Sequence, residues 1–113
     1  MKPAILTLAM TGASGADYTL RLFEFCLQQG IHVQFITSQP GQIVLGMETD
    51  LKLPGRPAGI QRTLRERFGA AEGQLRVFGH EEWTAPVASG SSVPRAMVVC
   101  PCTTGTLASI AAV

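Results

Sequence analysis

The sequence predicts an α/β fold in which helices connect the strands of a mostly parallel sheet. Runs rich in apolar and β-branched residues, at 4–10, 31–37 and 96–100, have the length of strands. Segments with helical periodicity follow these runs, and turns containing glycine or proline separate the elements. Strands that alternate with helices favour parallel pairing with right-handed crossovers, so ligands are expected beyond the carboxyl ends of the strands.

The first elements form a β-α-β unit. An apolar strand over residues 4–10 ends in the glycine turn 11–15 (TGASG). A helix from Asp17 follows, because polar residues recur there at helical spacing among apolar ones. With a single polar stripe, this helix is predicted to be mostly buried. Gly30 stands where a helix C-terminal glycine belongs, and residues 31–37 then form the second strand.

The middle of the chain gives weaker signals. Apolar residues after Pro40 predict a short helix that ends near residues 48–50. Several prolines and glycines follow, ahead of an arginine-rich segment, 61–68, that is expected to be a surface helix with its arginines in water.

Two more strands complete the pattern, at residues 74–78 and 96–100. Pro101 stops the second of these, and a helix is expected from Thr103 onward. About four strands is fewer than the five or six of a typical open nucleotide-binding sheet. We therefore expect residues 1–113 to form one domain whose C-terminal part is missing.

Composition excludes several function classes. A chain of 113 residues with 46% apolar content can build one hydrophobic core. The formal charge of +1 gives no basis for nucleic-acid binding, and no apolar run reaches the ~18–20 residues of a membrane span. The three cysteines belong to no metal-ligand set, so reduced thiols in the cytoplasm and no metal site are predicted.

The first glycine turn is a candidate phosphate site, because it joins a strand to a helix N-terminus and carries the Ser14 hydroxyl. The same turn also serves widely as a plain strand-helix connection. A dinucleotide site is disfavoured, because Asp17 stands where that motif needs its last glycine. Ser38 ends the second strand, where an acidic residue would bind the ribose.

A second hydroxyl-rich loop follows the 96–100 strand. Thr103, Thr104 and Thr106 surround Gly105 at a predicted helix start, facing the same sheet edge as the first loop. Two such loops could cradle one phosphorylated ligand, although a threonine here could equally be only a helix cap. Cys100 and Cys102 flank Pro101 on an extended segment and are expected to be packing residues.

Three other features could belong to a site. The small residues 89–92 could form an anion-binding nest, or simply a loop. Trp83 could stack on a ligand or cover the edge of the core. Glu48, if partly buried beside a pocket, would have a raised pKa and could handle protons, whereas by default it is a solvated helix end. His32 and His80 have no visible catalytic partner.

Three stretches, in this order, resemble the UbiX-like flavin prenyltransferases: 11–16 (TGASGA), 88–91 (ASGS) and 99–107 (VCPCTTGTL). The triplet 48–50 (ETD) fits the same pattern, so the resemblance spans almost the whole chain. It implies a Rossmann-like three-layer sandwich and a cytoplasmic homo-oligomer, commonly a dodecamer, with reduced FMN at subunit interfaces.

The resemblance also implies an enzyme activity. A metal-independent prenyltransferase would alkylate reduced FMN at N5 with dimethylallyl monophosphate, and ring closure at C6 would follow. The prenylated FMN would serve a partner decarboxylase of the UbiD type, as in ubiquinone biosynthesis.

The resemblance assigns roles residue by residue. The catalytic residues would be Ser14, near the flavin N5 edge, Glu48, as the proton-handling carboxylate, and Trp83, whose ring would stabilise an allylic cation. Ser89 and Gly90 would bind the prenyl phosphate. The FMN-binding residues would be Gly12, Ala13, Ser14, Ser38, Thr103, Thr104, Gly105 and Thr106.

The sequence departs from the family pattern in two ways. Thr103 replaces the usual serine, a change that keeps the hydroxyl group. The family's chains also run past residue 113, and their Lys, Arg and Tyr ligands for the prenyl phosphate come from that later portion. A chain ending at Val113 is therefore expected to bind FMN weakly and not to turn over.

Two other functions stay open from the sequence. One is a related FMN-dependent cysteine decarboxylase, which usually has a catalytic His early in its first helix, where this chain has Asp17 and Tyr18. The other is a non-catalytic FMN-binding fragment, or a subunit that only supports an oligomer.

Overall fold

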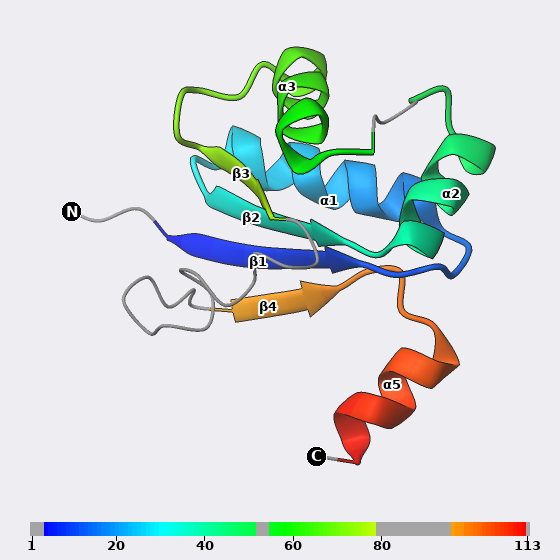
Figure 1. The fold of residues 1–113 in the computed structure, drawn as a ribbon. Coiled ribbons are helices and arrows are strands. Elements are labelled where there is room, and N and C mark those ends of the chain that lie inside the picture. The colour runs from blue at the N-terminus through cyan, green and yellow to red at the C-terminus, as the bar shows by residue number, and fades with distance from the viewer. Residues whose placement is uncertain (1–3, 52–54, 79–95, 113) are drawn as a thin grey trace.

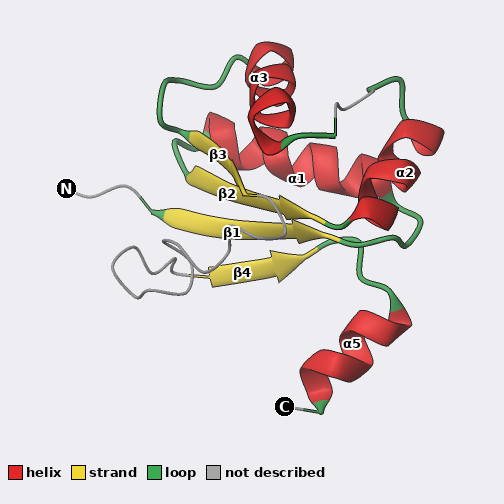
Figure 2. Cartoon of the chain, viewed as in Figure 1, coloured by secondary structure: helices red, strands yellow, loops and turns green. Residues whose placement is uncertain are grey.

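The computed structural model describes residues 4–51, 55–78 and 96–112. Figure 1 shows a parallel sheet with its helices, and Figure 2 shows the same view by secondary structure. In chain order the elements are β1 (Ile5–Met10), α1 (Ala16–Gln28), β2 (His32–Thr37), α2 (Gln39–Glu48), α3 (Pro57–Phe68), β3 (Leu75–Phe78), β4 (Ala96–Val99) and α5 (Thr104–Ala111). The predicted alternation of strands and helices is confirmed.

The sheet has four strands in the order β3-β2-β1-β4, and every neighbouring pair is parallel. β1 lies between β2 and β4, with Leu8 opposite Phe35 on one side and Val98 on the other. The strands therefore all end at one edge, toward α2 and the start of α5 in Figure 1. That edge is where the predicted loops meet.

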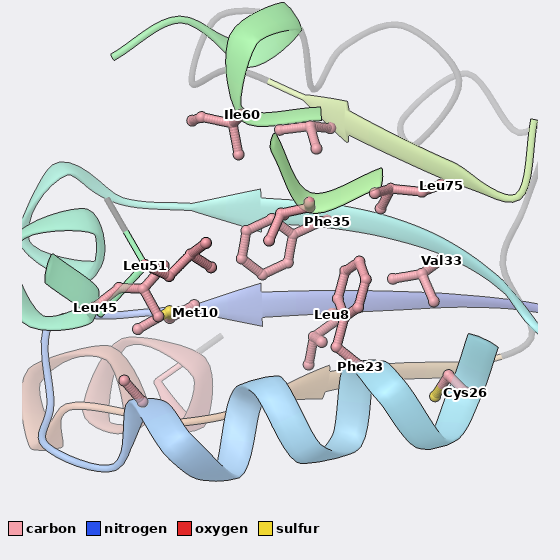
Figure 3. Packing of buried hydrophobic residues seen from close by; sticks show 13 residues of the cluster. Leu8, Met10, Phe23, Cys26, Val33, Phe35, Leu45, Leu51, Ile60 and Leu75 are labelled. Carbon is pink, nitrogen blue, oxygen red and sulfur yellow. The ribbon is translucent and has the colours of Figure 1, made fainter. Parts of the chain in front are cut away.

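The core lies between one face of the sheet and α1, α2 and α3. Alternate strand residues, such as Leu8 and Met10 in β1, point to this face, as the two-residue period of a strand requires. Phe23 of α1 lies at its centre, with its ring centroid 5.9 Å from that of Phe35 (Figure 3). The described part thus shows the sheet and one helical layer of the predicted sandwich.

The prediction that α1 is mostly buried is wrong. Tyr18 is 74% exposed and Phe25 is 56% exposed. The buried residues of α1 are Ala16, Thr19, Phe23 and Cys26, which follow one another at three- or four-residue spacing. A helix that packs on one face of a sheet contacts it along such a stripe, so apolar residues off the stripe are left exposed in the described part.

α3 begins at Pro57, four residues before its predicted start at 61. Proline fits the first turn of a helix, where its missing N–H has no intrahelical partner. The helix is also not purely a surface element, because Ile60 and Leu64 are 1% exposed in the core. The arginines at positions 56, 62, 65 and 67 are exposed, as predicted.

Gly41 in the first turn of α2 should not tolerate a side chain. A Cβ there would lie 2.7 Å from Thr37 Oγ1 and 2.8 Å from the Met10 carbonyl oxygen. Gly41→Ala is therefore expected to lower the free energy of unfolding by about 1–3 kcal/mol, as overpacking does. Urea denaturation measures the loss.

Gly46, in the same helix, is the matched control, since nothing lies within 4 Å of a Cβ built on it. Gly46→Ala should stabilise the protein by about 0.5–1 kcal/mol, because alanine loses less backbone entropy in a helix. Equal effects at both positions would contradict the close approach of α2 to β1.

Candidate functional site

The loops after β1 and β4 meet at the carboxyl edge of the sheet, as their positions in the sequence predict. Thr11 joins them. Its backbone N–H donates to the Pro101 carbonyl at 3.1 Å, and its Oγ1 donates to the same oxygen at 2.7 Å. The Thr103 N–H donates to Thr11 Oγ1 at 2.9 Å. Two segments 92 residues apart in sequence thus form one surface.

Two of the predicted catalytic residues, Ser14 and Glu48, are in direct contact. Ser14 Oγ donates to Glu48 Oε2 at 2.5 Å. The backbone N–H groups of Gly15 and Ala16 donate to Glu48 Oε1 at 2.9 and 3.0 Å. Gly15 makes this possible, because its φ of 118° lies in the left-handed region that glycine adopts without strain. The carboxylate at the end of α2 therefore caps the N-terminus of α1.

The contact settles the direction of the Glu48 pKa. The Ser14 hydroxyl first, and then the backbone N–H groups of Gly15 and Ala16, lower this pKa from its ordinary value, because all three donate to the ionised carboxylate. The partial burial that would raise the pKa of Glu48 is not found, since the side chain is exposed and its carboxylate accepts three hydrogen bonds. These hydrogen bonds therefore favour the ionised form of Glu48.

The contact with Glu48 also occupies the phosphate site predicted in the first loop. The N–H groups of Gly15 and Ala16 belong to the predicted phosphate site. In the structure they already bind the negatively charged carboxylate of Glu48. The loop also packs closely on α2, because a Cβ at Gly12 would lie 2.6 Å from Pro40 Cβ. An external phosphate at the α1 N-terminus would have to displace Glu48.

Ser38 and Thr103 are both helix caps. Ser38 Oγ accepts from the Gly41 N–H at 3.1 Å at the start of α2. Thr103 Oγ1 accepts from the Thr106 N–H at 3.1 Å and donates to Thr106 Oγ1 at 2.8 Å. Thr103 therefore caps α5, which is one of the two roles that its position in the sequence predicts. Thr104 and Gly105, in the first turn of α5, are exposed.

An apolar pocket of about 270 Å³ brings Ser38 and Thr106 together at this edge. Its lining residues are Ala9, Met10, Thr11, Ile36, Thr37, Ser38, Met97 and Thr106. A second hollow of about 400 Å³ also borders Ser38 and extends toward Gln42 and Phe78. Together they approach the size of a site for a small cofactor.

Sequence reasoning missed six of the eight lining residues of the apolar pocket. Strand alternation could have found Ala9, Ile36 and Met97, because each lies one position away from a core residue and so faces the opposite side of the sheet. No sequence signal marks the bridging role of Thr11. A larger hollow of about 790 Å³, between α1 and the end of α3, contains none of the predicted site residues.

The structure describes some of the remaining predicted features, such as the cysteines, and leaves others outside the described residues. Trp83, Ser89 and Gly90 lie outside the described residues, as does His80. Cys26, Cys100 and Cys102 are free thiols. Within residues 4–51, 55–78 and 96–112, no group of three or more His, Cys, Asp or Glu side chains could hold a metal ion. No helix in these ranges is long and apolar enough to cross a membrane.

Residues 1–112 match a family model described as Flavoprotein. Among curated proteins, the flavin prenyltransferase UbiX of Pseudomonas aeruginosa is 54% identical over 109 residues, covering 96% of this chain and 52% of that protein. UbiX of Halalkalibacterium halodurans is 36% identical over 107 residues, which cover 95% of this chain and 50% of the relative. The chain spans about half the length of the curated relatives it matches.

Solved structures also resemble this chain in fold. AnUbiX (PadA1), in complex with FMN and dimethylallyl pyrophosphate, superposes with a TM-score of 0.77 at 25% identity, over 98% of this chain and 52% of that one. A dodecameric FMN-dependent UbiX-like decarboxylase from Escherichia coli O157:H7 has a TM-score of 0.74 at 24% identity, over 96% and 52% of the two chains. These likenesses confirm the predicted α/β fold.

Proposed function

This chain belongs to the flavoprotein family, and from that premise we propose that it is the flavin-binding part of a flavin prenyltransferase. The reaction would transfer a dimethylallyl group from dimethylallyl monophosphate to reduced FMN. The observation that carries the proposal is the contact between Glu48 and Ser14 of the first loop, which follows β1 at the same edge of the sheet as the apolar pocket. It occurs in a chain 54% identical to a flavin prenyltransferase over 109 residues.

The described residues suit FMN. Ala9, Ile36 and Met97 give the pocket apolar walls that a flat isoalloxazine ring would contact, and Ser38 and Thr106 add hydroxyl groups at its rim. Gly12 and Ala13 would line the approach from the first loop.

The start of α5 would complete the FMN site. Its N-terminal N–H groups and the exposed Thr104 hydroxyl can bind ribityl or phosphate oxygens, together with Thr103 and Gly105. Because Glu48 holds the N-terminus of α1, the flavin phosphate would bind at the α5 end.

Ser14 and Glu48 would handle the proton of the reaction. Bound in its reduced form, FMN supplies the nucleophilic N5 that takes up the dimethylallyl group. The phosphate would leave with the electron pair of the broken carbon–oxygen bond, and Ser14 and Glu48 would take up the proton that the flavin releases. Glu48 is ionised and bonded to Ser14 Oγ, so this pair can accept that proton directly or through the hydroxyl.

Three further residues keep roles that come from the family resemblance. Trp83 would face the allylic cation, and Ser89 and Gly90 would bind the prenyl phosphate. All three lie outside the described residues.

The proposal extends to partners and location. The prenylated FMN would pass to a UbiD-type decarboxylase, with ubiquinone biosynthesis as one setting. A homo-oligomer, with twelve copies as the family resemblance implies, is supported by large apolar side chains exposed in the described part, such as Tyr18 and Met47. A cytoplasmic location is supported by the free thiols.

Anaerobic incubation of the full-length protein with reduced FMN and dimethylallyl monophosphate tests the proposal. We expect the extracted flavin to gain the mass of one five-carbon prenyl unit, detected by mass spectrometry. Reactions without the prenyl phosphate should show no gain. An unchanged flavin mass, in an assay where the Pseudomonas aeruginosa relative turns over, would reject the activity.

A further inference from the structure

We propose that Thr11 is a positioning residue for the flavin site, because its hydroxyl group fixes the start of α5 against the end of β1. The proposal rests on the proposed function in one respect, namely that FMN is the ligand bound there. Thr11 lines the apolar pocket, and its contacts with the loop after β4 hold Thr103, which in turn binds Thr106 at the rim of the pocket.

The sheet itself does not hold this loop. The pairing of β1 with β4 ends with the Cys100 N–H donating to the Ala9 carbonyl at 2.8 Å. Pro101 follows and has no N–H to donate. Past this point, within the described part of the chain, the hydrogen bonds between the two loops all involve Thr11.

In the described part of the chain, this attachment holds the start of α5 near the end of β1. None of its residues is buried in the described part of the chain, and the helix extends away from the sheet beyond β4 (Figure 1). Its N-cap, Thr103, is held from both sides. The Thr103 N–H donates to Thr11 Oγ1, and Thr103 Oγ1 binds Thr106. A shift of the Thr11 hydroxyl would therefore move the cap and Thr106 with it.

The chemistry requires a hydroxyl group at position 11. Thr11 Oγ1 donates to Pro101 O and accepts from the Thr103 N–H at the same time, which needs one side-chain atom that is both donor and acceptor. β-branching also restricts χ1 and so holds the hydroxyl in place. Serine can make the same two bonds, whereas valine and alanine can make neither.

Thr19 supplies a matched control. Its Oγ1 donates to the Cys100 carbonyl at 2.6 Å, so it also ties a hydroxyl group to the end of β4. It lies in α1 and has no bond to Thr103. Loss of the Thr19 hydroxyl should therefore weaken the strand end without releasing the start of α5.

The test measures FMN dissociation constants and thermal midpoints of the full-length protein and its variants. Thr11→Val is expected to weaken FMN binding about tenfold, the equivalent of about 1.4 kcal/mol. Thr11→Ser should restore the affinity to near that of the wild type. Thr19→Val should lower the thermal midpoint to a similar extent as Thr11→Val and leave the FMN dissociation constant unchanged.

Hydrogen exchange of residues 103–112 gives a reading that does not depend on FMN. Exchange should become faster in Thr11→Val and stay unchanged in Thr19→Val. If the wild-type protein does not bind FMN, the proposed function fails while this exchange still decides the role of Thr11.

Several outcomes would overturn the positioning role. These are wild-type FMN affinity in Thr11→Val, equal weakening in Thr19→Val, or failure of serine to restore binding. Thr11→Ala removes the hydroxyl without a methyl group against Pro101, and it replaces the valine variant if that one does not fold. If neither folds while Thr19→Val does, Thr11 is required for folding and the positioning role is rejected.

Discussion

Glu48→Gln is expected to lower the rate of prenyl transfer at least about a hundredfold and to leave FMN binding nearly intact, as loss of a general base does. Glutamine can keep the geometry, because its carbonyl oxygen accepts from the Gly15 and Ala16 N–H groups as Oε1 of Glu48 does. What it removes is the negative charge and the proton-accepting oxygen beside Ser14. Anaerobic single-turnover assays with mass detection of the flavin measure the rate.

Asp50→Asn is the control for this prediction. Asp50 is another exposed carboxylate two residues further on, and its contact is an exposed ion pair with Arg67 at 3.4 Å. Its loss should change neither rate nor stability noticeably, since such pairs contribute little. A rate for Glu48→Gln within tenfold of the wild type would show that Glu48 only anchors the first loop.

The pH dependence of stability tests the anchoring of the first loop by Glu48 separately from its role in proton transfer. The folded-state pKa of Glu48 lies below its ordinary value of 4.5, so the unfolded chain binds the proton more tightly than the folded one. The stabilisation is therefore fully present above about pH 4.5 and is lost as the pH falls through the lower folded-state pKa. The difference in thermal midpoint between the wild type and Glu48→Gln should narrow over that range.

Phe23→Ala is expected to lower the free energy of unfolding by about 3–5 kcal/mol, a large share of the ~5–15 kcal/mol that stabilises a typical domain. Phe23 is 1% exposed. Its ring centroid lies 5.9 Å from that of Phe35 and 5.1 Å from that of Phe68, so it joins α1, β2 and α3. Truncation would leave a cavity among all three, and urea denaturation measures the cost.

Phe25, two residues away on the same helix, is the matched control. It is 56% exposed, so Phe25→Ala should cost no more than about 0.5 kcal/mol. A loss at Phe25 as large as that at Phe23 would contradict the assignment of the core-facing stripe of α1.

The local elements were predictable because their causes are local. The apolar runs set β1, β2 and β4, and Gly30, at a φ of 73°, ends α1 as its position in the sequence predicts. The start of α3 was not predictable, because Pro57 follows Gly55 in a stretch that equally suits a loop. Proline both breaks helices and begins them, and only the packing of Ile60 and Leu64 in the core decides between the two.

The sequence also did not predict which apolar side chains of α1 are exposed. An apolar side chain has the same hydropathy on either side of a helix, so Phe23 and Phe25 look alike in the sequence. Their difference depends on where the sheet lies. The sheet contacts a single stripe of the helix, and Phe25 falls outside that stripe.

The sequence by itself therefore determined the α/β fold, the loops that meet at the sheet edge and the identities of Ser14 and Glu48 as candidates. Only the tertiary structure decided that these two side chains touch across 34 residues of sequence, and that Thr11 reaches Thr103 across 92. It also decided the direction of the Glu48 pKa. The physical reason is that strand and helix patterns arise from neighbouring residues, whereas hydrogen-bond partners and charge environment depend on chain segments that only folding brings together.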